Sequence, residues 1–123
     1  MSQDTRPLPL FLFFAGLFGL AGVALAAVTA HAGGDAGLAA SASTMCLAHA
    51  PALLGLAFAA DRIRTGRLAG LLLIVGTVLF AGDLVMLRFA GSRLFPYAAP
   101  TGGWAMMLGW LAIAAGAFLR RKD

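Results

Sequence analysis

The sequence predicts an all-α protein, a bundle of four transmembrane helices that run alternately up and down through a bilayer. Of the 123 residues, 61% are hydrophobic and 11% are charged, whereas a soluble domain has about half apolar and about a quarter charged residues. A chain this short cannot bury so large an apolar excess in a core of its own. The apolar residues also form four long runs, and most of the charges lie between or beyond these runs. The surrounding solvent is therefore expected to be lipid.

The four apolar runs cover residues 9–30, 38–60, 68–89 and 102–119. Each approaches or exceeds the length of about 20 residues that a helix needs to cross the hydrocarbon core. The first run follows a basic residue, as a signal peptide does, but it is about twice the usual length of a signal's apolar stretch. We therefore expect it to be a spanning helix that is not removed.

Glycine, proline and charged residues mark the breaks between these runs, at residues 33–35, 61–67 and 91–96. Connections this short predict antiparallel neighbouring helices within one membrane domain over residues 1–123.

The basic residues predict the orientation of the bundle. Seven of them precede the first run, lie in the second connection or follow the last run, and two lie on the other side. Cytoplasmic loops carry an excess of Lys and Arg, which places both termini in the cytoplasm. The net charge of +4 does not gather in one stripe, so we expect the partner to be a lipid bilayer and no nucleic acid. The seven are Arg6, Arg62, Arg64, Arg67, Arg120, Arg121 and Lys122; the two are Arg88 and Arg93.

In lipid, no hydrophobic driving force brings helices together, so close packing of their backbones must stabilise the bundle. Small residues permit this close packing, and we expect helices to contact each other at these positions. Gly16, Gly19 and Gly22 occur at three-residue spacing in the first run, and Gly109 lies in the fourth. Two interpretations stay open: these positions pack inside one bundle, or they dock a homo-oligomer or another membrane subunit.

Three ionisable residues, His31, His49 and Asp83, form a candidate polar cluster. At about 1.5 Å per residue, His49 lies roughly 17 Å and Asp83 roughly 22 Å from the cytoplasmic end, with His31 at the outer surface. A charged side chain inside a spanning helix needs a partner. We predict that His49 partners Asp83, because Arg88 lies five residues after Asp83 and is poorly phased to reach it.

The cluster has three possible roles. It can be a clamp that sets helix register, a step for a proton or small solute, or a metal site that adds Cys46 to His49. A single Cys-x-x-His on an apolar helix is a weak metal signature, so we expect no metal. The sequence contains no phosphate-binding glycine loop, no nucleophile with an evident base and no haem attachment motif. We therefore expect no enzyme, no catalytic residue and no cofactor.

Several short motifs occur in a characteristic order along the chain. They are AVTAHA at 27–32, MCLAHA at 45–50, LFAGDL at 79–84, PTGG at 100–103 and LGW at 108–110. In order and spacing the chain resembles the small four-helix membrane proteins grouped as domain of unknown function four-two-three, over roughly residues 10–119. The resemblance implies a bacterial inner-membrane protein and brings no reaction or ligand.

The resemblance also bears on the polar cluster. His31 and His49 fall where the family pattern has histidines, whereas Asp83 stands where a serine is expected. The aromatic residues usual before His49 and after Leu84 are missing.

Three functions follow from the sequence, in order of preference. The first is a non-catalytic accessory, assembly or stabilising subunit of a larger membrane complex, because the chain is small and rich in packing residues. The alternative is a small transport or ion- or proton-handling protein that uses His49 and Asp83. The third is a membrane-embedded enzyme or metal carrier.

Overall fold

The computed structural model describes residues 6–31 and 36–119. It contains four α-helices: α1 (Pro9–His31), α2 (Gly37–Ala59), α3 (Gly66–Ala90) and α4 (Ala98–Gly116). A short 3-10 helix, η1 (Ala60–Arg62), joins α2 to α3. These described residues include no strand, which confirms the predicted all-α class.

Two parts of the sequence-based prediction fall outside this description. The predicted break at residues 33–35 and the basic residues Arg120, Arg121 and Lys122 lie outside the described residues.

The helix α4 begins four residues earlier and ends three residues earlier than the run 102–119 predicted. Pro100 lies in its first turn. A proline is tolerated there because the first N–H groups of a helix have no intrahelical acceptor. The predicted break at residues 91–96, with Pro96, lies in the connection before this helix, whereas Pro100 belongs to the helix.

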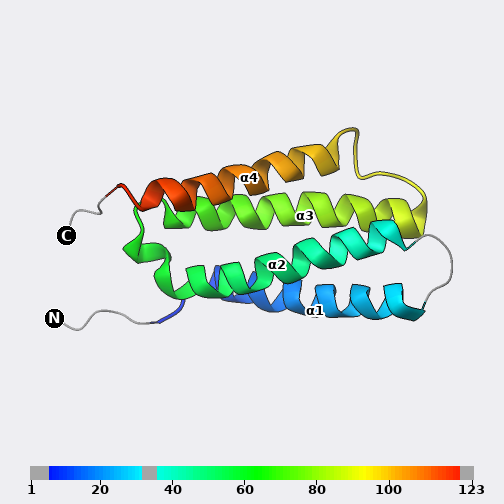
Figure 1. Ribbon diagram of the computed structural model, residues 1–123, viewed down its shortest axis with the longest axis horizontal. Helices are drawn as coiled ribbons and strands as arrows, with labels where there is room; N and C mark the ends of the chain where they lie inside the picture. The colour runs from blue at the N-terminus through cyan, green and yellow to red at the C-terminus, as the bar shows by residue number, and fades with distance from the viewer. Residues whose placement is uncertain (1–5, 32–35, 120–123) are drawn as a thin grey trace.

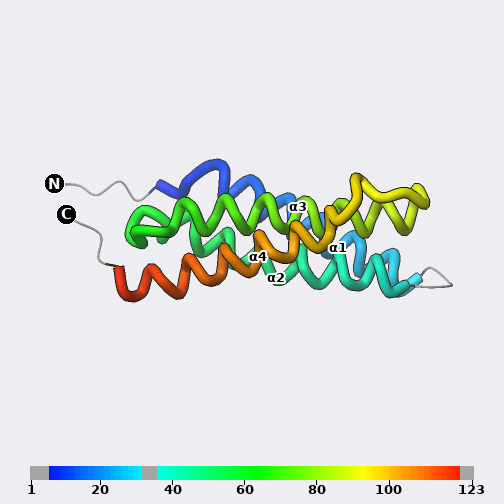
Figure 2. Tube along the Cα trace, turned by 90° about the horizontal axis from the view of Figure 1, so that it is seen from above, coloured from blue at the N-terminus to red at the C-terminus, as the bar shows by residue number. Residues whose placement is uncertain are grey.

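Successive helices run in opposite directions (Figure 1). The beginning of α1, the turn with η1 and the end of α4 share one end of the molecule, which we name the η1 end. The connection between α3 and α4 lies at the opposite end. Figure 2, turned by 90°, shows the same arrangement.

The molecule consists of two helical hairpins, α1–α2 and α3–α4, joined mainly where α2 packs on α3. Within the described residues, the backbone of α4 comes close to α3 but not to α1 or α2. The helix α3 is therefore the centre of the packing, and the close backbone contacts of α4 are with α3.

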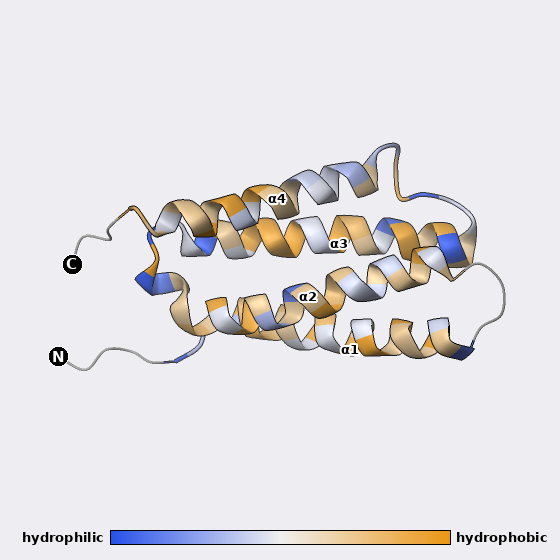
Figure 3. Cartoon of the chain, viewed as in Figure 1, coloured by the Kyte–Doolittle hydropathy of each residue, from blue (hydrophilic) through white to orange (hydrophobic). Residues whose placement is uncertain are grey.

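Three helical stretches are long and apolar enough to cross a membrane: α1, α2 continued through η1 to Arg62, and α3. The helix α4 has 19 residues and does not belong to this set. Its first half is less hydrophobic than its second half (Figure 3), since it contains proline, threonine and two glycines. A fourth crossing stays a prediction. Only 22% of the apolar window of α1 is buried, against 44% in α2 and α3, so α1 presents most of its surface outward.

The backbones of α3 and α4 approach each other closely at Gly76 and Gly102. A Cβ added to Gly76 would lie 2.7 Å from the Gly102 carbonyl oxygen, and one added to Gly102 would lie 2.6 Å from the Gly76 carbonyl oxygen. Neither backbone can move away without separating the helices. The two glycines therefore allow the contact that attaches α4.

The four predicted packing glycines lie in different surroundings. Gly19 and Gly22 face α2, and Gly109 faces α3. Gly16 is exposed, and a Cβ built on it would meet nothing within 4 Å. Gly16 therefore does not pack within this fold, because the rotation of α1 turns it away from α2.

Gly102 and its neighbour Gly103 should respond in opposite ways to alanine. Gly102→Ala should lower the free energy of unfolding by about 1–3 kcal/mol, because the added methyl group overpacks the contact with α3. A Cβ on Gly103 meets nothing within 4 Å, so Gly103→Ala should raise stability by about 0.4–1 kcal/mol. Equilibrium unfolding in mixed micelles measures both. Equal effects of the two substitutions would contradict the packing described here.

Candidate functional site

Asp83 of α3 is completely buried and bound by the connection between α3 and α4. Its Oδ2 accepts a hydrogen bond from Nη1 of Arg93 at 2.8 Å, and its Oδ1 accepts one from the backbone N–H of Leu94 at 2.9 Å. The carboxylate has no exposed surface, whereas 49% of the Arg93 side chain is exposed. The negative charge is thus compensated by an arginine that keeps contact with the surroundings.

The backbone after α3 brings Arg93 to this position. The helix ends at Ala90, and Gly91 follows with a φ of 73°, a left-handed conformation that glycine adopts without a steric penalty. The chain turns back at this point, and residues 93 and 94 come to lie beside Asp83. A glycine at the end of the helix thus makes the ion pair possible.

His49 of α2 forms a second buried polar contact, with α4. Its Nδ1 lies 2.8 Å from the carbonyl oxygen of Met45, and its Nε2 lies 3.1 Å from Nε1 of Trp110. A carbonyl can only accept and an indole N–H can only donate. The imidazole is therefore neutral, with its proton on Nδ1 and with Nε2 accepting from Trp110.

The contact between His49 and Trp110 spans helices whose backbones do not approach each other closely. The two rings are tilted at 53° with centroids 5.8 Å apart. Only 4% of His49 is exposed. The pair therefore ties the α1–α2 hairpin to the α3–α4 hairpin.

The structure separates the predicted polar cluster into three places. His49 and Asp83 have different partners, so the predicted pairing between them is wrong. His49 lies about 18 Å from the beginning of α2, whereas Asp83 lies about 10 Å from the end of α3. His31 is exposed at the last residue of α1.

Sequence reasoning missed both actual partners. Trp110 is 12 residues into α4, as His49 is 12 residues into α2, but this match depends on the start of α4 at Ala98, four residues before the predicted start. Arg93 had no signal in the sequence, because it lies in a connection whose path depends on Gly91.

Cys46 is buried on the face of α2 that carries His49. Among the residues that the structure describes, no three or more His, Cys, Asp or Glu side chains are grouped so that they could hold a metal ion. The polar contacts of His49 and Asp83 are made with side chains and backbone groups of the protein itself, and their geometry suits positioning of helices.

The family model described as "Protein of unknown function (DUF423)" matches residues 25–103, more than half of the chain. The chain belongs to this family. The match confirms the resemblance found in the motifs. It includes His31, His49, Asp83 and Arg93, whereas Trp110 lies beyond it.

Two relatives carry names that place them in membranes. The UPF0382 inner membrane protein YgdD of Escherichia coli K12 is 37% identical over 81 residues, which are 60% of this chain and 59% of the relative. The UPF0382 membrane protein of Haemophilus influenzae is 33% identical over 66 residues, which are 51% of this chain and 53% of the relative. The matched part thus spans less than two thirds of either relative. No solved structure matches the chain.

The ion pair predicts a non-additive pair of substitutions. Arg93→Gln leaves the buried carboxylate of Asp83 without a cation and should lower the free energy of unfolding by about 3 kcal/mol. This is the lower end of the range for buried pairs, because Arg93 is half-exposed. Adding Asp83→Asn should recover most of the loss, since the amide needs no counter-charge. Unfolding in mixed micelles measures both, and equal stability of the single and double variants would contradict the pair.

The His49 contact predicts an effect confined to one of two tryptophans. Trp110→Phe removes the indole donor and leaves Nε2 of His49 unpaired, which should cost about 0.6–1.7 kcal/mol of stability. Trp104, an exposed residue of the same helix, provides the control, and Trp104→Phe should change stability little. Nitrogen chemical shifts of His49 should move only in the first variant. Similar effects from the two substitutions would exclude the bridging role.

Proposed function

We propose that the protein is a non-catalytic accessory, assembly or stabilising subunit of a larger complex in the bacterial inner membrane. The observation that carries this proposal is the state of the buried ionisable groups. Both nitrogens of His49 and both oxygens of Asp83 are already engaged by partners within the fold. A group that carries protons or ions must exchange its partners during each cycle. These contacts instead favour a rigid helical scaffold over the alternative role in transport or proton handling.

The outward surface of α1 supports a docking role. Phe13, Leu20 and Val23 are exposed by 63%, 70% and 62%, and Gly16 lies among them in open space. Glycine in a helix costs about 1 kcal/mol relative to alanine. Gly16 contributes no contact inside the fold that would offset this cost. A neighbouring helix that packs closely against Gly16 would offset this cost.

The proposed placement in the membrane has four crossings and both termini in the cytoplasm. The name of the Escherichia coli relative supports the inner membrane. Arg6 lies just before α1, and Arg62 and Arg64 lie in or just after η1, so these basic residues share the η1 end. An excess of basic residues is typical of the cytoplasmic side. The path of α4 back to this end supports the fourth crossing.

Migration on a native gel tests the accessory role. Tagged protein extracted in mild detergent should migrate with other chains, which mass spectrometry of the band identifies. Gly16→Leu should reduce this co-migration at least about tenfold, because a close helix contact cannot admit the larger side chain. Gly55→Leu is the matched control, since Gly55 is also an exposed helical glycine with nothing within 4 Å of an added Cβ.

Two results would contradict the proposal. One is migration of the wild-type protein as a free monomer or small homo-oligomer. The other is equal co-migration of both glycine variants, which would remove α1 as the docking helix.

A further inference from the structure

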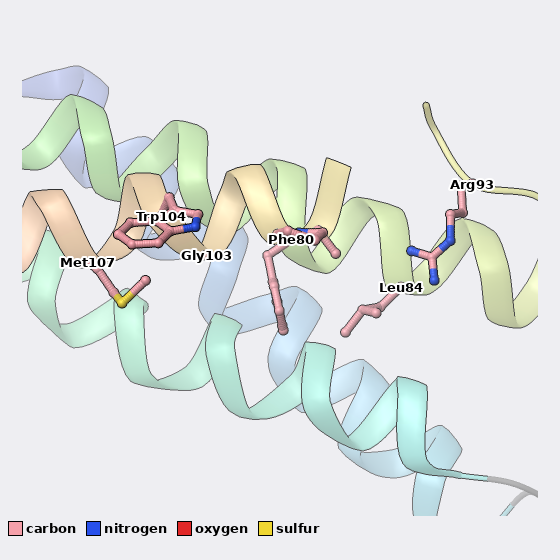
Figure 4. Close-up of a pocket in the computed structure, with 8 residues that line it drawn as sticks. Phe80, Leu84, Arg93, Gly103, Trp104 and Met107 are labelled. Carbon is pink, nitrogen blue, oxygen red and sulfur yellow. The ribbon is translucent and has the colours of Figure 1, made fainter. Parts of the chain in front are cut away.

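A groove between α3 and α4 opens on the surface near the connection that holds Asp83. Its volume is about 480 Å³. Figure 4 shows Arg93 at one end of this groove and the apolar side chains along it. The residues that carry the argument are Phe80 and Leu84 of α3, Gly103, Trp104 and Met107 of α4, and Arg93.

A second hollow, of about 360 Å³, adjoins the first. It is lined by Arg93, Pro96, Tyr97 and Pro100, so Arg93 and Pro100 belong to both hollows. The second hollow lies in the connection and the first turn of α4, at the end of the bundle. The first extends along the helices toward Met107. The cation of Arg93 therefore lies where the two hollows meet.

The guanidinium of Arg93 can bind a second anion while it holds Asp83. It has five N–H donors in a planar fork, and Asp83 accepts from Nη1 alone. Since the Arg93 side chain is 49% exposed and lines both hollows, donors are available at the junction. Asp83 thus holds the guanidinium in place, which lowers the entropic cost of binding a ligand there.

Two exposed aromatic side chains line the hollows. Tyr97 and Trp104 are exposed by 76% and 65%, and such aromatic side chains gather at membrane interfaces. Arg93 is shared by the hollow beside Tyr97 and the apolar groove. A phospholipid likewise carries its phosphodiester between a headgroup and its acyl chains.

We propose that the groove and the adjoining hollow bind one phospholipid, with an acyl chain in the groove, the phosphodiester on Arg93 and the headgroup in the hollow beside Tyr97. Arginine pairs with phosphate through parallel N–H donors, and basic pockets between membrane helices bind lipid headgroups. A partner helix with only apolar side chains would fill the groove but would supply no anion for Arg93. The inference does not depend on the proposed accessory role.

Lipid binding to the purified full chain tests the proposal by native mass spectrometry in mild detergent. The probes are phosphatidylglycerol, diacylglycerol with the same acyl chains, and inorganic phosphate. Phosphatidylglycerol should bind at least about tenfold more tightly than diacylglycerol, because only the former offers a charged acceptor to Arg93. The double variant Arg93→Gln/Asp83→Asn, which leaves no buried charge unpaired, should bind the two lipids equally.

The variant Gly103→Leu tests the contribution of the groove to lipid binding separately from that of Arg93. A Cβ at Gly103 meets nothing within 4 Å, so the leucine should occupy the groove without disturbing the fold. It should weaken binding of both lipids at least about tenfold, through the loss of the apolar space. Gly55→Leu, at an exposed helical glycine of α2, should leave lipid binding unchanged.

Three results would overturn the proposal. The first is undiminished lipid binding by Gly103→Leu. The second is saturable binding of inorganic phosphate that equals that of phosphatidylglycerol, which would identify a free anion as the ligand. The third is a lipid-free dimer that Gly103→Leu dissociates, which would identify a second copy as the occupant.

Discussion

A carboxylate enclosed by apolar helices is stable only with a cation and N–H donors around it, and this requirement at Asp83 organises one end of the protein. Arg93 and the Leu94 amide meet it together. Both lie in the connection after Gly91, so the buried charge holds that connection against α3. The position of this connection in turn sets where α4 begins and where the guanidinium lies relative to the groove.

The attachment of α4 combines two kinds of contact that suit a lipid environment. At Gly76 and Gly102 the backbones of α3 and α4 approach more closely than any side chain would permit. At His49 and Trp110 a hydrogen bond reaches across helices that do not otherwise come close. Close packing and interhelical hydrogen bonds stabilise helix pairs where lipid removes the hydrophobic drive. The helix α4 is therefore held mainly by α3 and by one side chain of α2.

The buried polar groups and the exposed surface features of the protein both bear on its function. The carboxylate of Asp83 and the imidazole of His49 are engaged by partners inside the fold, which favours a rigid body over a carrier. The surface, in contrast, offers an exposed glycine among large apolar side chains on α1, and a groove with an arginine at its end between α3 and α4. The docking face proposed on α1 and the lipid site proposed between α3 and α4 both suit a small rigid protein within a larger membrane assembly.

The sequence alone determined the helical class, the positions of three of the helices to within a few residues and the family, because apolar run length and the order of short motifs are local properties. It also singled out His49 and Asp83, since an ionisable residue in an apolar run is conspicuous without any structure. Rise per residue predicts depth but not rotation about the helix axis. The tertiary structure therefore decided that Gly22 packs while Gly16 faces outward. It also decided that Asp83 binds Arg93, because the path of the chain after Gly91 depends on packing that no local pattern encodes.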